Sequence, residues 1–114
     1  MNGAGRASTV DFSHLENYVA GDRAVVREVL SLFSDQARTV LPTLNPHAPD
    51  DEWRHAAHSL KGSALGIGAF ALAEACSDAE SARSAPPEVK RAALSRIAEA
   101  LAQALTDIAI YTQG

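Results

Sequence analysis

Apolar residues recur every three or four positions along most of this chain of 114 residues, and no segment alternates apolar with polar residues. A period near 3.6 is that of an α-helix with one buried face, whereas a half-buried strand has a period of two. Aromatic residues make up only 5% of the sequence and alanine is abundant, which favours closely packed helices over a sheet. The sequence therefore predicts an all-α fold.

Breaks in this periodicity divide the chain into five expected helices. Asp22 is a suitable N-cap, Pro87 suits a first helical turn, and Gly21 suits a helix end. The expected helices begin near residues 12, 22, 50, 69 and 87, and the first four end near residues 20, 41, 67 and 83. Because the connections are short, we expect the last four to form an antiparallel four-helix bundle, with the first as a short extra N-terminal helix.

The domain organisation follows from the same pattern. Residues 1–10 are small and polar, so we expect a flexible N-terminal tail there. Residues 11–114 suffice for one compact domain, and no internal repeat divides them.

Composition excludes several classes of function. The net charge of −4 argues against nucleic acid as a partner, because phosphate binding needs a basic surface. No apolar stretch reaches the length of a membrane helix, and no basic-then-apolar start resembles a signal peptide. The single cysteine, Cys76, excludes an internal disulfide and suits a reducing compartment, so we expect a cytoplasmic protein.

The third expected helix carries the most informative residues. Its apolar stripe consists of Trp53, Ala56, Leu60, Ala64 and Ile67. At about 100° per residue, His58 points away from the middle of that stripe. Its face also holds Lys61, Gly62, Arg54 and Leu65. An imidazole, a cation one turn later and a bare patch of backbone are thus predicted to face outward together.

Gly62 needs an explanation, because glycine inside a helix costs about 1 kcal/mol relative to alanine. Either something must approach the backbone closely from outside, or the helix packs closely on another through Gly62 and Gly66. For His58 and Lys61 the simplest interpretation is that each is merely solvated. Cys76 is most simply a small core residue, and Lys90 and Arg91 are interpreted as part of a solvated face.

These residues resemble the signature of histidine-containing phosphotransfer (HPt) domains. The matching positions are His58, Lys61, Gly62 and Ser63, followed by Gly68, Ala69, Leu72, Cys76 and Glu80. The resemblance covers nearly the whole chain, because the helix pattern and the loop before the third helix also fit. Ala79, where a larger apolar residue is expected, and Pro42, in a long helix, depart from the pattern and concern packing only.

The resemblance implies a phosphorelay intermediate of two-component signalling. His58 would accept a phosphoryl group on Nε2 from the aspartate of a receiver domain and pass it to another receiver domain. Lys61 would stabilise the added charge, and Gly62 would allow close approach of the receiver. Neutral imidazole, with an unperturbed pKa of about 6.5, is a suitable nucleophile near pH 7.

The partners and cofactors expected on this interpretation follow from the family. The partners are receiver domains of response regulators or of a hybrid histidine kinase, with Arg54 and Leu65 as docking residues. Neither a membrane nor a nucleic acid is expected as a partner, and a monomer is expected. The chain should need no cofactor or metal of its own, because the receiver would bring Mg²⁺.

Three alternatives compete with this interpretation. A histidine autokinase would need an ATP site, and the chain has neither a glycine-rich phosphate loop nor length for a second domain. His55 and His58 could share a metal ion, although the third ligand would have to come from His14, His47 or a distant carboxylate. The last alternative is a helical module that docks receivers or other partners without any chemistry.

Overall fold

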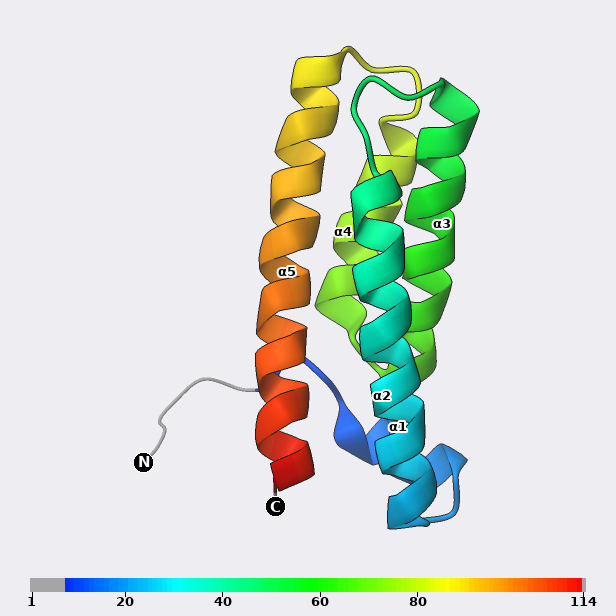
Figure 1. Cartoon of the computed structure of the whole chain (residues 1–114), viewed down its shortest axis with the longest axis vertical. Helices are drawn as coiled ribbons and strands as arrows, with labels where there is room; N and C mark the ends of the chain where they lie inside the picture. The colour runs from blue at the N-terminus through cyan, green and yellow to red at the C-terminus, as the bar shows by residue number, and fades with distance from the viewer. Residues whose placement is uncertain (1–7, 114) are drawn as a thin grey trace.

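The computed structural model describes residues 8–113, in which every regular element is helical (Figure 1). The elements are α1 (Phe12–Tyr18), α2 (Arg23–Val40), the 3-10 helix η1 (Leu41–Thr43), α3 (Asp50–Ile67), α4 (Phe70–Ser81) and α5 (Pro87–Gln113). The all-α prediction and its short first helix are thereby confirmed for this range. No helix in it is both long enough and apolar enough to cross a membrane.

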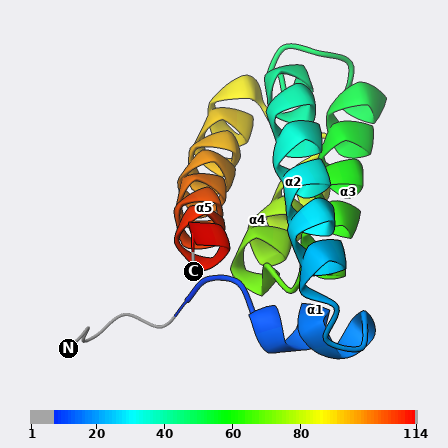
Figure 2. The ribbon, with the colours of Figure 1, turned by 60° about the horizontal axis from the view of Figure 1, so that its bottom comes forward.

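The four longer helices lie side by side. Contacts join α2 to α3, α3 to α4, α4 to α5 and α5 to α2. The loops that follow η1 and α4 lie at the same end of the molecule, and the turn between α3 and α4 lies toward the other end (Figure 1). The helix α1 lies at that second end, where it contacts α2 and α3 (Figure 2). The middle of α3 is therefore held between two neighbouring helices.

The helix ends have clear local causes. The carboxylate of Asp22 accepts hydrogen bonds from the backbone N–H groups of Ala24 and Val25, at 3.0 and 3.2 Å, and so caps α2 as predicted. Pro42 has no backbone N–H with which to continue the hydrogen bonds of α2, and the helix gives way there to the tighter turn of η1, although Leu41 itself keeps helical φ and ψ of −52° and −45°. The helix α3 ends near the expected position: Gly66 lies inside it, and Gly68 is its C-cap.

The predicted apolar stripe of α3 forms the centre of the core. All five of its members are buried: Trp53, Ala56, Leu60, Ala64 and Ile67. The indole N–H of Trp53 donates a hydrogen bond of 2.8 Å to the carbonyl oxygen of Ala79 in α4. Cys76 is fully buried, as predicted, and burial raises the pKa of its thiol to about 12. The face of α3 opposite this stripe is therefore not part of the core.

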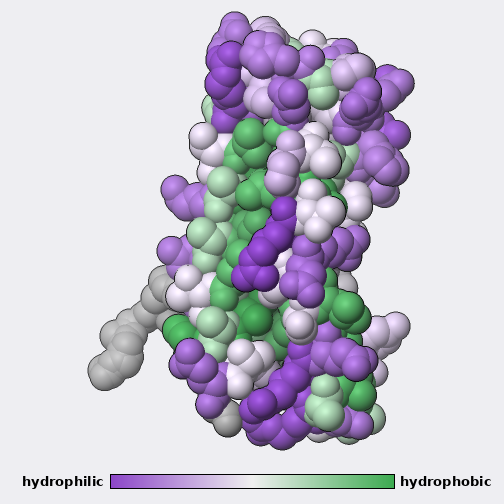
Figure 3. All heavy atoms as spheres, in the orientation of Figure 1, coloured by the Kyte–Doolittle hydropathy of each residue, from purple (hydrophilic) through white to green (hydrophobic). Residues whose placement is uncertain are grey.

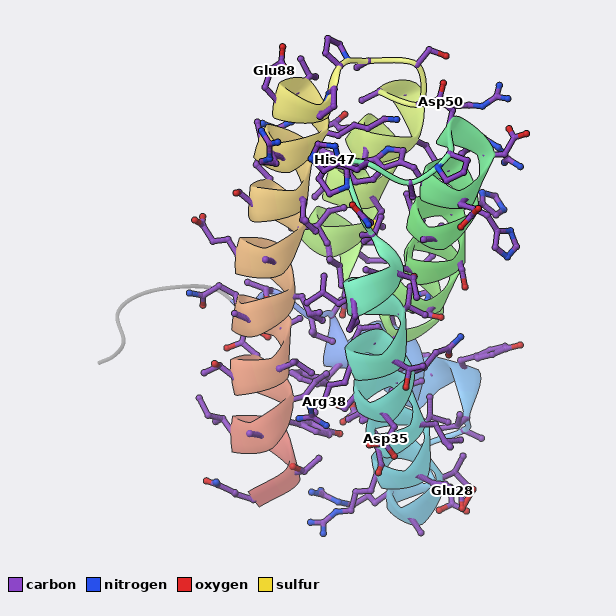
Figure 4. All side chains as sticks on the ribbon, turned by 45° about the horizontal axis from the view of Figure 1, so that its top comes forward. Glu28, Asp35, Arg38, His47, Asp50 and Glu88 are labelled. Carbon is purple, nitrogen blue, oxygen red and sulfur yellow. The ribbon has the colours of Figure 1, made fainter. Side chains whose placement is uncertain are left out.

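Lys90 does not lie on a solvated face, so that interpretation was wrong. Its side chain is only 3% exposed, and its amine donates a hydrogen bond of 2.8 Å to Asp50 at the start of α3. The same amine lies 5.7 Å from the centre of the Trp53 ring. A lysine stem packs well along apolar surface when its amine finds a carboxylate, which periodicity does not reveal. Asp50 and His47 lie at the same end of the molecule as Glu88, in the first turn of α5 (Figure 4).

The residues just before α1 are packed against the helices. Val10 is buried, and the backbone N–H and hydroxyl of Thr9 both donate to one carboxylate oxygen of Asp107 in α5, at 2.8 and 2.7 Å. Of the tail expected over residues 1–10, residues 1–7 lie outside the described part of the chain. Thr9 and Val10, by contrast, connect the start of the domain to its last helix.

Gly68 is the glycine that the fold most requires. Its φ of +81° is left-handed, and a Cβ there would lie 2.8 Å from the carbonyl oxygen of Asp11. Its own carbonyl accepts a hydrogen bond of 2.9 Å from the N–H of Asp11. We expect Gly68→Ala to lower the free energy of unfolding by about 2 kcal/mol, from backbone strain and this clash.

Denaturant unfolding measures that loss, and Gly66→Ala is its matched control. Gly66 has ordinary helical geometry, and a Cβ there would meet no atom within 4 Å. The control should therefore be neutral or more stable by up to about 1 kcal/mol. Equal stabilities of the two variants would contradict the role given to Gly68.

Candidate functional site

His58 lies in the middle of α3 on the face that points away from the core. Its side chain is 62% exposed, as the helical periodicity predicts. Ala57 on one side of it along the chain is fully buried, and Leu60 is buried two residues later, so the helix is held firmly by its other face. The imidazole is thus presented to solvent from a rigid element.

Glu80 of α4 contacts both polar side chains of this face. Its Oε2 lies 3.1 Å from Nδ1 of His58, and its Oε1 lies 3.0 Å from the amine of Lys61. The Glu80 side chain is only 18% exposed, because it lies between the two helices. One carboxylate therefore links the imidazole to the ammonium group across the α3–α4 contact.

The contact with Glu80 selects which ring nitrogen of His58 carries the proton in the neutral imidazole. Burial raises the pKa of Glu80, but the Lys61 ammonium and the His58 N–H outweigh this effect and hold that pKa below its ordinary value. An ionised carboxylate can only accept hydrogen bonds, so Nδ1 of His58 must carry the proton. The lone pair of a neutral ring then lies on Nε2, which is the nitrogen left free to attack an electrophile.

Lys61 adds a positive charge one turn after His58. Its side chain is 28% exposed and forms the ion pair with Glu80, so it is not simply a solvated charge. An ammonium group has three donors, and one contact with Glu80 leaves capacity for a second anion. The face thus combines a nucleophilic nitrogen with a cation suited to a phosphoryl or carboxyl group.

Gly62 leaves the surface beside His58 open. A Cβ at this position would meet no atom within 4 Å, so Gly62 does not serve close packing against another helix. Arg54 and Leu65, which we expected on the same face, are both exposed. Every residue predicted for the site therefore lies on the exposed side of α3.

Two of the other three histidines lie away from this face, and His55 lies one turn before His58 on α3. His47 contacts Arg91 at the start of α5, with 3.2 Å between Nε2 and Nη2, and the ring of His14 lies edge-on to Phe70, 5.6 Å between ring centres. Within residues 8–113, no three His, Cys, Asp or Glu side chains lie close enough together to hold a metal ion.

Glu80 is the site residue to which sequence reasoning gave no role. It was recognised only as part of a family pattern, because 22 residues separate it from His58. A signal was present in the spacing about the turn: His58 lies ten residues before Gly68 and Glu80 twelve residues after it. Residues nearly equidistant from a tight turn between two helices come level with each other, which could have brought this pair together.

Comparison with known proteins adds two similarities. A family model described as "Hpt domain" matches residues 28–109, a range that includes His58, Lys61, Gly62 and Glu80. The crystal structure of the histidine phosphotransferase ShpA from Caulobacter crescentus is similar with a TM-score of 0.76. Its sequence is 42% identical, over 93% of this chain and 92% of that chain. No curated protein matches the chain significantly.

Proposed function

The chain belongs to the family of histidine-containing phosphotransfer (HPt) domains, and from that premise we propose that His58 carries the phosphoryl group. The protein functions as a phosphorelay intermediate in two-component signalling. The observation that supports His58 is its geometry: an exposed imidazole whose Nδ1 is held by Glu80 and whose Nε2 is open. His14, His47 and His55 lack that combination of a carboxylate and a lysine.

The proposed chemistry is a phosphoryl exchange between two side chains. Nε2 of His58 attacks the phosphorus of an aspartyl phosphate on a receiver domain. The N–P bond forms as the bond from phosphorus to the carboxylate oxygen breaks, and the aspartate carboxylate leaves. The reverse reaction, with a second receiver, returns the phosphoryl group to an aspartate. Positioning and electrostatics supply most of the catalysis in such a transfer.

The cofactor and the partners belong to the same proposal. The receiver domain, of a response regulator or of a hybrid histidine kinase, supplies Mg²⁺ for the transfer, and this domain supplies no cofactor. Arg54 and Leu65 flank His58 and are proposed docking residues. In this proposal the helices α2 to α5 form an antiparallel four-helix bundle, and the contacts between neighbouring helices support the bundle. The proposed protein is a monomer and is cytoplasmic.

One experiment tests the function directly. The protein is offered radiolabelled ATP alone, and then a receiver domain that already carries labelled phosphate. We expect no label from ATP and an acid-labile label from the receiver, as a phosphoramidate gives. Labelling from ATP alone would indicate an autokinase, and no labelling from receivers of any kind would leave only the docking module.

Lys61 is expected to assist the transfer without being indispensable. Lys61→Ala removes one charge-assisted contact to the phosphoryl group, and such bonds contribute roughly 1.5–3 kcal/mol. The transfer rate should fall by about ten- to hundredfold if that contact forms only as the phosphoryl group arrives.

Rapid-quench measurement of the transfer from a labelled receiver gives this rate. Arg96→Ala is the control, because it removes a positive charge from an exposed position of α5 away from the site. An unchanged rate in Lys61→Ala would show that this lysine serves only its ion pair with Glu80.

A further inference from the structure

A groove between α2 and α5 lies away from His58. These two helices approach each other less closely than the other neighbouring pairs of the bundle, and the hollow between them has a volume of about 410 Å³. It lies on the edge of the bundle opposite the contact between α3 and α4, where Glu80 meets His58. Its walls include Arg27, Ser34 and Arg38 of α2 and Leu105, Ile108 and Ala109 of α5.

The floor of this α2–α5 groove is apolar and elongated. Figure 3 shows an apolar band along the line between α5 and α2. Leu94 and Leu105 of α5 are both only partly buried, and the helix rises by about 16 Å from one to the other. The hydroxyl of Ser34 donates a hydrogen bond of 3.0 Å to the carbonyl oxygen of Leu30 and so needs no further partner. An exposed apolar surface of this kind marks a place where another molecule binds.

Positive charges border the groove on the α2 side. Arg27 and Arg38 both line it, and Arg23 lies one turn before Arg27 on the same face of the helix. Arg38 pairs with Asp35 at 3.7 Å, where both side chains are largely exposed (Figure 4), whereas Arg27 forms no ion pair within residues 8–113. The residues of α5 that line the groove are uncharged. This border therefore attracts an anionic partner, although the whole chain carries a net charge of −4.

We propose that the α2–α5 groove binds an amphipathic helix of a partner protein, whose apolar face enters the groove and whose acidic side meets Arg27 and Arg38. A helix suits the apolar floor because its backbone hydrogen bonds are made internally. An extended peptide would instead leave polar backbone groups over an apolar surface. Carboxylates that bind the arginines at the border would fix the direction in which the helix lies.

Two other occupants fit the groove less well. A second copy of this chain, related by a two-fold axis, would bring the same arginines of α2 against each other. A membrane surface would meet the two helices that border the groove but not the floor between them. An acidic helix satisfies both the charge of the border and the shape of the floor.

A partner in this groove leaves the relay face free. Because His58 and the groove lie on opposite edges of the bundle, a receiver domain and the partner helix can bind at the same time. The groove would then tether the domain to a partner and raise the local concentration of a linked receiver. This role goes beyond phosphotransfer and does not depend on which histidine carries the phosphoryl group.

A designed peptide tests the groove. The probe is a fluorescent amphipathic helix of about 18 residues, long enough to span the apolar band, with leucines on one face and glutamates beside them. One control peptide carries lysine in place of each glutamate, and the other has the glutamate sequence scrambled. In anisotropy titrations with the whole chain, only the amphipathic glutamate peptide should bind, and more weakly as salt is added. Equal binding of the three peptides would overturn the proposal.

Substitutions locate the binding site. Arg27→Glu combined with Arg38→Glu should weaken binding of the glutamate peptide by about tenfold or more, because each change replaces an attraction by a repulsion. Arg96→Glu is the control and should bind like the wild type, since Arg96 is exposed on the side of α5 opposite Leu105. Ala109→Gln places a longer side chain in the groove at an exposed position, and should weaken binding while the melting temperature stays close to that of the wild type.

The proposal also has outcomes that contradict it. Unchanged affinity in the arginine variant or in Ala109→Gln would place the peptide elsewhere. The bound peptide should leave transfer from a receiver at its full rate, and inhibition would place it on the face of His58. Sedimentation that shows a dimer dissociated by the arginine substitutions would assign the groove to a second copy. Binding to phosphatidylserine vesicles, with none to the peptide, would assign it to a membrane.

Discussion

Replacing His58 by glutamine is expected to abolish acceptance of phosphate from a receiver while the helical fold remains intact. Glutamine has no nucleophilic nitrogen, so the N–P bond cannot form. The side chain is 62% exposed, and polar replacements at exposed positions normally change stability by about 0.5 kcal/mol or less. The amide can still meet Glu80, which limits any disturbance of the α3–α4 contact. Labelling from a phosphorylated receiver and thermal unfolding measure the two effects.

His55→Gln is the matched control for that experiment. His55 is exposed on the same helix, one turn earlier, and has no contact with Glu80. It should accept phosphate like the wild type. Full labelling of His58→Gln, or loss of labelling in His55→Gln alone, would contradict the assignment of the site.

Gly62→Gln is expected to act in opposite directions on stability and on transfer. No atom lies within 4 Å of a Cβ at this position, and glutamine is a better helix former than glycine, so the melting temperature should stay equal or rise. The new side chain would project beside His58 into the space that a receiver must occupy. Misplacement of reacting groups by about 1 Å can already reduce a rate a hundredfold, and we expect at least that loss.

Gly66→Gln separates a local effect from a general one. Gly66 is equally open, yet it lines a groove toward Leu32 of α2 and not the surface around His58. It should gain stability in the same way and transfer phosphate at the wild-type rate. A destabilised Gly62→Gln protein, or equal loss of transfer in the two variants, would refute the open-face explanation.

The parts of this molecule that periodicity encodes could be predicted. The stripe that begins with Trp53 fixed which face of α3 is buried, and hence that His58, Lys61 and Gly62 point outward. The preference of aspartate for N-cap positions likewise identified Asp22 as the residue at which α2 starts, directly after the helix end expected at Gly21. Each of these inferences uses residues within a few turns of one helix, where spacing alone determines position.

The parts that depend on contacts between helices could not be predicted in the same way. The roles of Glu80 and Lys90 are set by partners on α3, His58 and Asp50, which lie far away in sequence. A charged residue has the same pattern in a sequence whether it is solvated or paired.

Polar side chains also line the exposed apolar band between α5 and α2, where Arg38 and Asp35 form an ion pair of 3.7 Å (Figures 3 and 4).

The bonds from Thr9 to Asp107 have a consequence for how such a domain can be built into larger proteins. They bring the point where the chain enters the fold to within hydrogen-bond distance of its last helix, and Phe12 stacks on Tyr111 nearby, 4.1 Å between ring centres. Domains whose entry and exit lie close together can be inserted into a loop of a host protein without separating the host's two halves. The contacts between the start of the fold and α5 are thus of the kind that would suit insertion of this domain between other modules.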